Sequence, residues 1–124
     1  MASYPDLEVY QQGYRLALEV HHLTMTFPPE ERQGLVDQMR RASRSIPVNL
    51  AEGWGVHTGR NFAHYISQAL GSANEMAVHL DFARDLGYLD HDRHLEVQRG
   101  YEVLGKRMYV LRAKQLQEPG PSQC

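Results

Sequence analysis

The chain has 124 residues, of which 42% are hydrophobic and 23% charged, a composition typical of one globular domain that needs no metal or disulfide to hold its core. Cys124 is the only cysteine, so an intramolecular disulfide is excluded. The sequence also has no apolar run long enough to cross a bilayer and no N-terminal signal-peptide pattern, and a cytoplasmic location is therefore expected. The net charge of −2 argues against a general polyanion binder, whose surface is usually strongly basic.

The first half of the chain predicts two helices, because its apolar residues recur at spacings of three and four. The first helix is expected from about Asp6 to Thr26. The stretch "FPPEE" ends it, and Pro29 fits the first turn of the second helix. The inner positions of that second helix are predicted to be Leu35, Met39, Ala42, Ile46, Asn49 and Gly53.

The second half predicts two more helices, separated from the first pair by a turn at "GWGVHTG". The third helix is expected from about Arg60 to Leu86, with Gly87 as its C-terminal stop. Asp90 is expected to cap the fourth helix. The inner residues of the third helix are Phe62, Ile66, Ala69, Ala73, Met76, Leu80 and Ala83, and those of the fourth are Val97, Tyr101, Leu104, Met108 and Leu111.

Four long helices joined by short turns, without a strand signal, predict an all-α fold: an up-down-up-down left-handed four-helix bundle. A single domain is expected over residues 1–117, followed by a flexible C-terminal tail over residues 118–124.

Some apolar residues fall outside the inner positions. They are Leu7, Tyr10, Tyr14 and Ala17 on the first helix, Val78 and Phe82 on the third, and Val103 and Val110 on the fourth. Either they widen the inner stripe, or they form a surface for contact with another protein molecule. A homo-oligomer is the simplest such contact, because one chain then supplies both surfaces.

The stretch "RRASRSIPVNLAEGWG", residues 40–55, places a proline and several polar residues inside a predicted helix. Heptad spacing directs Pro47 outward, where it either bends the helix or marks a break before a restart capped by Ser45. Asn49 is directed inward, where it could either bond the carbonyl of Ser43 that Pro47 leaves free or fix the register of the helices, as single buried asparagines do in coiled coils. Ser45, Asn49 and Glu52 form either a structural polar network or, with Arg41, a site.

Two basic clusters stand out against the acidic net charge: Arg40, Arg41 and Arg44 on the second helix, and Lys106, Arg107, Arg112 and Lys114 on the fourth. Arginine suits forked contacts with carboxylates or phosphates. Heptad spacing directs Arg40, Arg41 and Arg44 outward. The two clusters form either a solvated helix face or a nucleic-acid-binding surface.

Catalytic chemistry has no candidate residues in the sequence. Cys124 has no nearby base, "GWGVHTG" lacks the lysine of a phosphate-binding loop, and His91 and His94 are too few for a metal site. We therefore expect a protein that is not an enzyme and has no cofactor and no metal.

The two blocks "FPPEERQGLVDQMRRASRSIPVNLAEGWG" and "FAHYISQALGSANEMAVHLDFARDLGYL" resemble the 23S rRNA intervening-sequence protein family, also called S23-type proteins. The resemblance covers about residues 7–115. The first block matches at Phe27, Pro28, Glu31, Arg41, Ala42, Ser45, Ile46, Pro47, Asn49, Ala51, Glu52 and Gly53. The second matches at Phe62, Ala69, Gly71, Ser72, Glu75, Gly87, Tyr88 and Leu89. Leu50 departs from the isoleucine that is usual there.

This resemblance implies a four-helix bundle that assembles as a homopentamer, and it implies little chemistry. Similar bundles accompany diversity-generating reverse transcriptases and bind nucleic acid through a basic surface, which makes RNA binding an analogy at the level of the fold. Two hypotheses follow. The protein is either an oligomeric module that binds RNA or another nucleic acid through Arg40, Arg41, Arg44, Lys106 and Arg107, or a self-assembling scaffold that binds protein partners.

Overall fold

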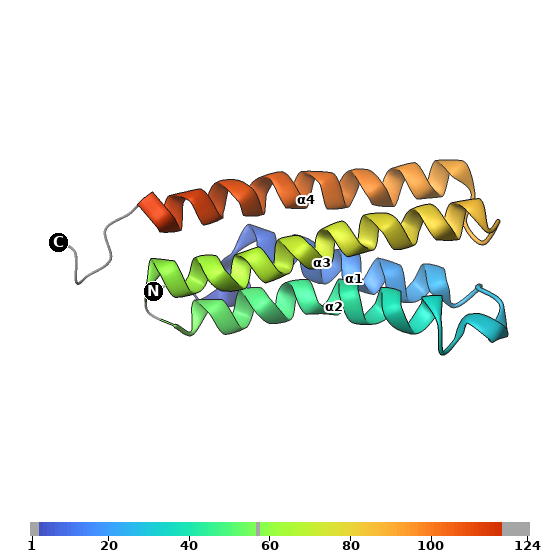
Figure 1. Cartoon of the computed structure of the whole chain (residues 1–124), viewed down its shortest axis with the longest axis horizontal. Helices are drawn as coiled ribbons and strands as arrows, with labels where there is room; N and C mark the ends of the chain where they lie inside the picture. Colours follow the sequence, from blue (N-terminus) through green and yellow to red (C-terminus); the bar gives the residue numbers. More distant parts are fainter. Residues whose placement is uncertain (1–2, 57, 118–124) are drawn as a thin grey trace.

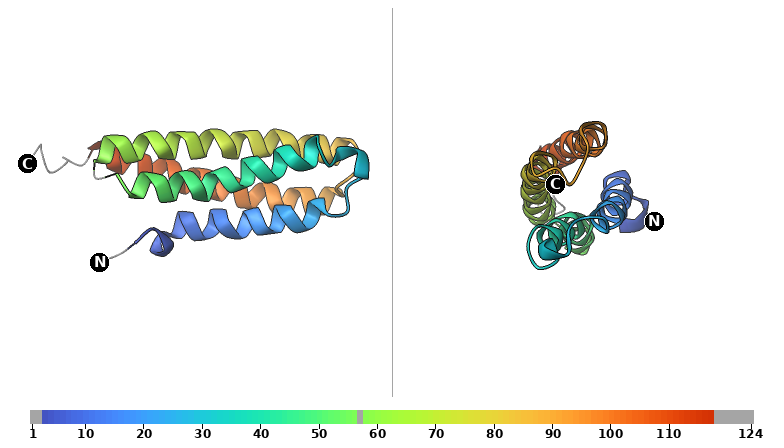
Figure 2. Two further views of the ribbon diagram at one scale, coloured as in Figure 1. Left: turned by 90° about the horizontal axis from the view of Figure 1, so that it is seen from below. Right: turned by 90° about the vertical axis from the view of Figure 1, so that its right-hand side faces the viewer.

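The protein is an all-α bundle in the computed structural model, which describes residues 3–56 and 58–117 (Figure 1). The helices are α1 (Glu8–Thr24), α2 (Leu35–Trp54), α3 (Gly59–Asp85) and α4 (His91–Gln117), and short 3-10 turns cover Tyr4–Asp6 and Pro29–Glu31. Successive helices run antiparallel and lie side by side in chain order, which confirms the predicted four-helix bundle (Figure 2). The predicted tail, residues 118–124, lies outside the described residues.

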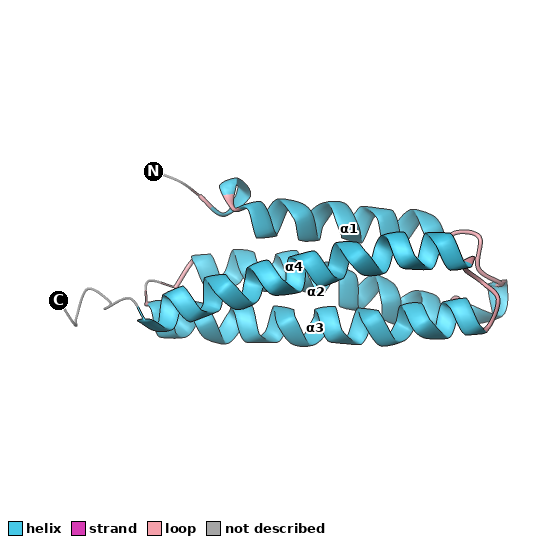
Figure 3. Ribbon diagram, turned by 90° about the horizontal axis from the view of Figure 1, so that it is seen from above, coloured by secondary structure: helices cyan, strands magenta, loops and turns pink. Residues whose placement is uncertain are grey.

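Short loops join the helices at the ends of the bundle (Figure 3). In the second half of the chain, the ends of the helices follow the predicted capping signals. The side chain of Thr58 accepts a hydrogen bond from the Asn61 amide at 3.1 Å and caps α3. Gly87 adopts a φ of 81°, a backbone conformation that suits glycine, and it ends α3 as expected. Asp90 caps α4 by accepting from the Arg93 amide at 2.7 Å.

The prediction that α2 begins at Pro29 is wrong, since Pro29–Glu31 forms a separate 3-10 turn and α2 begins at Leu35. The Glu31 carboxylate accounts for the difference. One of its oxygens accepts from the Leu35 amide at 3.3 Å, and the other accepts from the Tyr88 hydroxyl at 2.8 Å. The turn is thereby fixed to the loop between α3 and α4, a contact that local sequence does not encode.

A continuous apolar core runs along the bundle, and the inner residues predicted for α3 are all buried in it. On α4, Val97, Tyr101, Leu104 and Met108 are buried and Leu111 is partly buried, as expected. The residues with no exposed surface include Val20, Met39, Ile46, Leu50, Ile66, Met76, Leu80, Leu104 and Met108. The periodicity of the sequence therefore identified the core of α3 and α4.

The inner face of α2 differs from the prediction in its second half. Leu50 is fully buried, Asn49 is only partly buried, and Pro47 is buried rather than directed outward. The helix neither breaks nor restarts at Pro47. Because α2 packs against both α1 and α3, its buried face is wider than a two-residue heptad seam and includes Ser43 and Pro47.

Two glycines allow close approach between helices. Gly13 of α1 faces α2, where an added Cβ would lie 3.0 Å from the Ile46 Cγ2 and 3.7 Å from the Pro47 Cδ. Gly53 is buried inside α2, as predicted for an inner position of that helix, and an added Cβ would meet the Tyr65 Cβ of α3 at 2.7 Å. These two positions bring α2 close to both of its neighbours.

Packing around the bundle is uneven. α2 contacts α3 most extensively, followed by α3 with α4 and α1 with α2, whereas α1 contacts α4 least. The end-on view in Figure 2 shows the same arrangement, with the ribbons of α1 and α4 set further apart than the other neighbouring pairs.

Candidate interaction surfaces

Among the polar residues of the central α2 segment, Ser45 joins α2 to α3. The Ser45 hydroxyl donates to the Ala42 carbonyl at 2.8 Å and makes a short hydrogen bond with the Ser72 hydroxyl of α3. The Asn49 side-chain amide donates to the Ser45 carbonyl at 2.8 Å, not to the Ser43 carbonyl that was predicted. Glu52 is exposed and has no hydrogen bond to any of these groups. The arrangement is that of a structural network at a helix contact.

The arginine cluster of α2 does not form one outward face. Arg40 is partly buried and reaches across to the end of α1, where it donates to the Thr24 hydroxyl at 3.0 Å and to the His21 carbonyl at 3.2 Å. A cation beside the last carbonyls of a helix is stabilising. The prediction that Arg40 faces outward is therefore wrong, because its guanidinium caps the C-terminus of α1.

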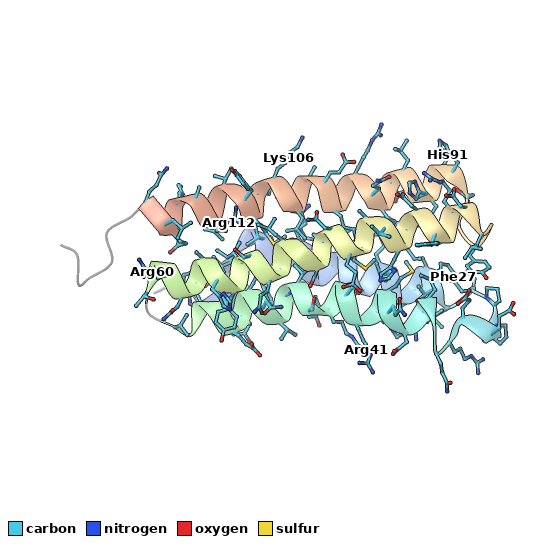
Figure 4. The ribbon with its side chains drawn as sticks, in the orientation of Figure 1. Phe27, Arg41, Arg60, His91, Lys106 and Arg112 are labelled. Carbon is cyan, nitrogen blue, oxygen red and sulfur yellow. The ribbon has the colours of Figure 1, made fainter. Side chains whose placement is uncertain are left out.

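Arg41 and Arg44 do face outward, as predicted. The Arg41 guanidinium pairs with Asp37 at 3.1 Å, and Figure 4 shows it pointing away from the bundle. Arg44 donates to the Arg40 carbonyl at 3.1 Å. The positive charge of Arg40, and to a smaller extent that of Arg44, lowers the pKa of the neighbouring His21 below its usual value. The α1–α2 side of the bundle is therefore locally positive near His21.

The basic cluster of α4 is better exposed. Lys106 projects into solvent in Figure 4, and Arg107 donates to the Gln12 side chain of α1 at 3.2 Å. Within the described part of the chain, no carboxylate lies within 4 Å of Lys106, Arg107 or Lys114. These three residues border a groove of about 420 Å³ between α1 and α4. This half of α4 is therefore the cationic surface with the fewest internal partners.

The apolar residues predicted for an oligomer surface are all exposed. Val78 and Phe82, which we name the α3 ridge, are 53% and 56% exposed. Val103 and Val110, which we name the α4 stripe, are 44% and 58% exposed. The alternative that they widen the inner stripe does not hold for these four residues.

The apolar residues predicted outside the core of the first helix, Leu7, Tyr10, Tyr14 and Ala17, divide into a core part and a surface part. Ala17 is buried, whereas Tyr14 is exposed and lines a groove between α1 and α2. We name this the tyrosine groove. Its volume is about 600 Å³, and Tyr4, Tyr10 and Tyr14 follow one another along it with ring centroids 5.0 and 6.0 Å apart. Pattern analysis of α1 alone could not find the groove, because α2 supplies its other wall.

The burial of His94 was not predicted from the sequence. His94 is 2% exposed, and its Nε2 lies 2.8 Å from an Asp81 carboxylate oxygen of α3. His91, three residues earlier, is exposed at the start of α4 (Figure 4). The described residues contain no group of three potential metal ligands. The His94–Asp81 pair therefore ties α3 to α4.

The chain is thus an all-α helical bundle whose distinctive features lie on its outer faces. In its described part, no helix is both long and apolar enough to span a membrane. The family model described as 23S rRNA-intervening sequence protein matches residues 5–110, and the chain belongs to that family, as its two sequence blocks indicate.

A solved structure has the same fold. It is a protein with unknown function from the S23 ribosomal protein family of Bacteroides thetaiotaomicron, 18% identical in sequence, with a TM-score of 0.77. The alignment covers 84% of the present chain and 97% of that chain. No curated protein was found to match the sequence.

Proposed function

We propose that this protein is a non-enzymatic, self-assembling helical bundle. The observation that carries the proposal is the exposure of the α3 ridge, two apolar side chains that project from a helix face opposite the core. Aligned exposed apolar residues favour burial against another protein surface. A second copy supplies such a surface at the same concentration as the first, which makes a homo-oligomer the simplest assembly.

Size-exclusion chromatography with light scattering tests the proposal. The expected result is a single species several times the mass of the 14.2 kDa chain, and the family resemblance suggests five copies. A monomer over the whole accessible concentration range would contradict the proposal.

Nucleic-acid binding is the second candidate function. The specific observation in its favour is the exposed cationic half of α4, where Lys106, Arg107 and Lys114 have no carboxylate within 4 Å among the described residues. The α2 cluster supports it less, because Arg40 caps α1 and Arg41 pairs with Asp37. Assembly would repeat the α4 surface on every subunit and increase the number of phosphates that one complex can neutralise.

RNA retention at about 50 and 200 mM salt tests this second function. Lys106→Glu with Arg107→Glu is expected to abolish retention, whereas Arg41→Glu with Arg44→Glu is the matched control with the same charge change and a smaller expected effect. Loss of retention in the control alone would place binding on the α2 cluster. No retention by the wild type at either salt concentration would leave assembly as the proposed function.

A further inference from the structure

The tyrosine groove has the form of an acceptor for an apolar helix edge. Its floor between α1 and α2 is apolar, and two of its side chains, Leu18 and Val48, are 49% and 52% exposed. Its volume is about 600 Å³, and it remains open along one side of the bundle. The tyrosines present both an apolar ring and a polar hydroxyl, a combination that is enriched at protein interfaces.

The α3 ridge has the complementary form. Val78 and Phe82 are four residues apart, so their side chains lie one above the other on a single helix face. That face points directly away from the core residues Met76 and Leu80. A convex apolar edge of two side chains is the shape that a groove between two helices accepts.

Charge distinguishes the α3 ridge from the α4 stripe as the occupant of the groove. The rim of the groove carries Arg44, His21 and His22 together with one carboxylate, Glu52, and the positive charge of Arg40 beside the His21 end lowers the pKa of His21. The exposed carboxylates of Glu75 and Asp85 flank the α3 ridge, where they also contact His79 and Arg84 of the same helix. The α4 stripe lies instead among Lys106, Arg107 and Lys114, which the rim of the groove would repel.

We propose that the tyrosine groove of one subunit binds the α3 ridge of a second copy of this chain. This inference rests on the proposed self-assembly and specifies its interface. Groove and ridge lie on different helices, so the contact is heterologous: each subunit uses its groove toward one neighbour and its ridge toward the other. Such contacts join copies head to tail, and they end only where the chain of subunits closes into a ring.

Two double variants, each defective on one side of the contact, test the inference. The ridge variant carries Val78→Glu and Phe82→Glu, and the groove variant carries Leu18→Glu and Val48→Glu. All four positions are about half exposed, so the bundle should fold, which circular dichroism checks. The matched control, Val103→Glu with Val110→Glu, places the same charges on the α4 stripe.

The expected masses are specific. Each defective variant alone is monomeric, and the control assembles as the wild type does. Mixed in equal amounts, the ridge and groove variants form a 1:1 dimer that grows no further, because an intact groove meets an intact ridge once and the introduced glutamates repel each other at the other contact.

Other outcomes overturn the inference in distinguishable ways. A monomeric wild type would remove the proposed function and this interface together. A wild-type assembly that survives in both defective variants, or that is lost in the control, would place the interface elsewhere and leave self-assembly standing. Two monomeric variants that fail to complement each other would exclude a head-to-tail contact between these two surfaces.

Discussion

Substitution of Gly53 by alanine tests whether the close packing of α2 against α3 limits what that position accepts. An added Cβ would lie 2.7 Å from the Tyr65 Cβ and 2.8 Å from the Phe62 Cδ1, both shorter than real Cβ contacts. The Tyr65 Cβ is bonded directly to the α3 backbone, so no rotamer change can move it away. The two helices must instead separate locally and lose part of their packing.

The magnitude follows from two opposing contributions. Alanine in place of glycine inside a helix contributes roughly 0.5–1 kcal/mol of stability, whereas overpacking a filled contact costs about 1–3 kcal/mol. We therefore expect Gly53→Ala to lower the free energy of unfolding, by up to about 2.5 kcal/mol. Gly105 on α4 provides the control, because nothing lies within 4 Å of an added Cβ there, and Gly105→Ala should raise the free energy by roughly 0.5–1 kcal/mol.

Urea unfolding followed by circular dichroism, at equal protein concentrations, measures both variants. The same substitution in two helices of one bundle is expected to shift the midpoint in opposite directions. Equal stabilisation by the two alanines would mean that α2 and α3 are further apart at Gly53 than described, and the packing argument would be refuted.

Three further substitutions test other contacts. Burial, and secondarily the charge of Glu19, raises the pKa of Tyr101, whose hydroxyl has no partner among the described residues. Because the folded state then favours the neutral phenol, the stability of the wild type should fall as the pH rises above about 10. In urea melts at pH 7 and 11, the stability of Tyr101→Phe should fall less than that of the wild type. Arg40→Met should lower the free energy of unfolding by about 1 kcal/mol, because the contact with α1 is lost, whereas Arg41→Met should change it by less than about 0.5 kcal/mol. Equal effects of the two substitutions in thermal melts would contradict the capping of α1 by Arg40. Leu50→Ala should lower the free energy of unfolding by about 2–5 kcal/mol, and Asn49→Ala by about 1 kcal/mol. The reverse order would mean that Asn49, not Leu50, faces the core.

The sequence predicted the features that depend on local pattern. Apolar spacing located four helices, and the glycine and aspartate signals at Gly87 and Asp90 identified the end of α3 and the cap of α4. The family resemblance was confirmed as well. Each of these features is encoded within a short stretch of chain, so one sequence was sufficient.

Features that depend on a second helix were not predictable in the same way. A strict heptad placed Asn49 inward, but a straight helix drifts by about 20° per heptad, and over α2 this drift favours Leu50 at the core. The close fit of this part of α2 against α1 uses the space at Gly13, where an added Cβ would lie 3.0 Å from the Ile46 Cγ2. Similarly, the capping role of Arg40 depends on where α1 ends beside it.

The sparse contact between α1 and α4 has a consequence for local stability. Because α1 shares most of its packing with α2 alone, its detachment breaks less packing than the opening of α2 or α3, and its amides should exchange hydrogen faster than theirs. A ligand that binds only the closed form slows such exchange in proportion to its occupancy. A neighbouring subunit seated in the groove between α1 and α2 would be such a ligand, so amide protection of α1 would report assembly without any measurement of mass.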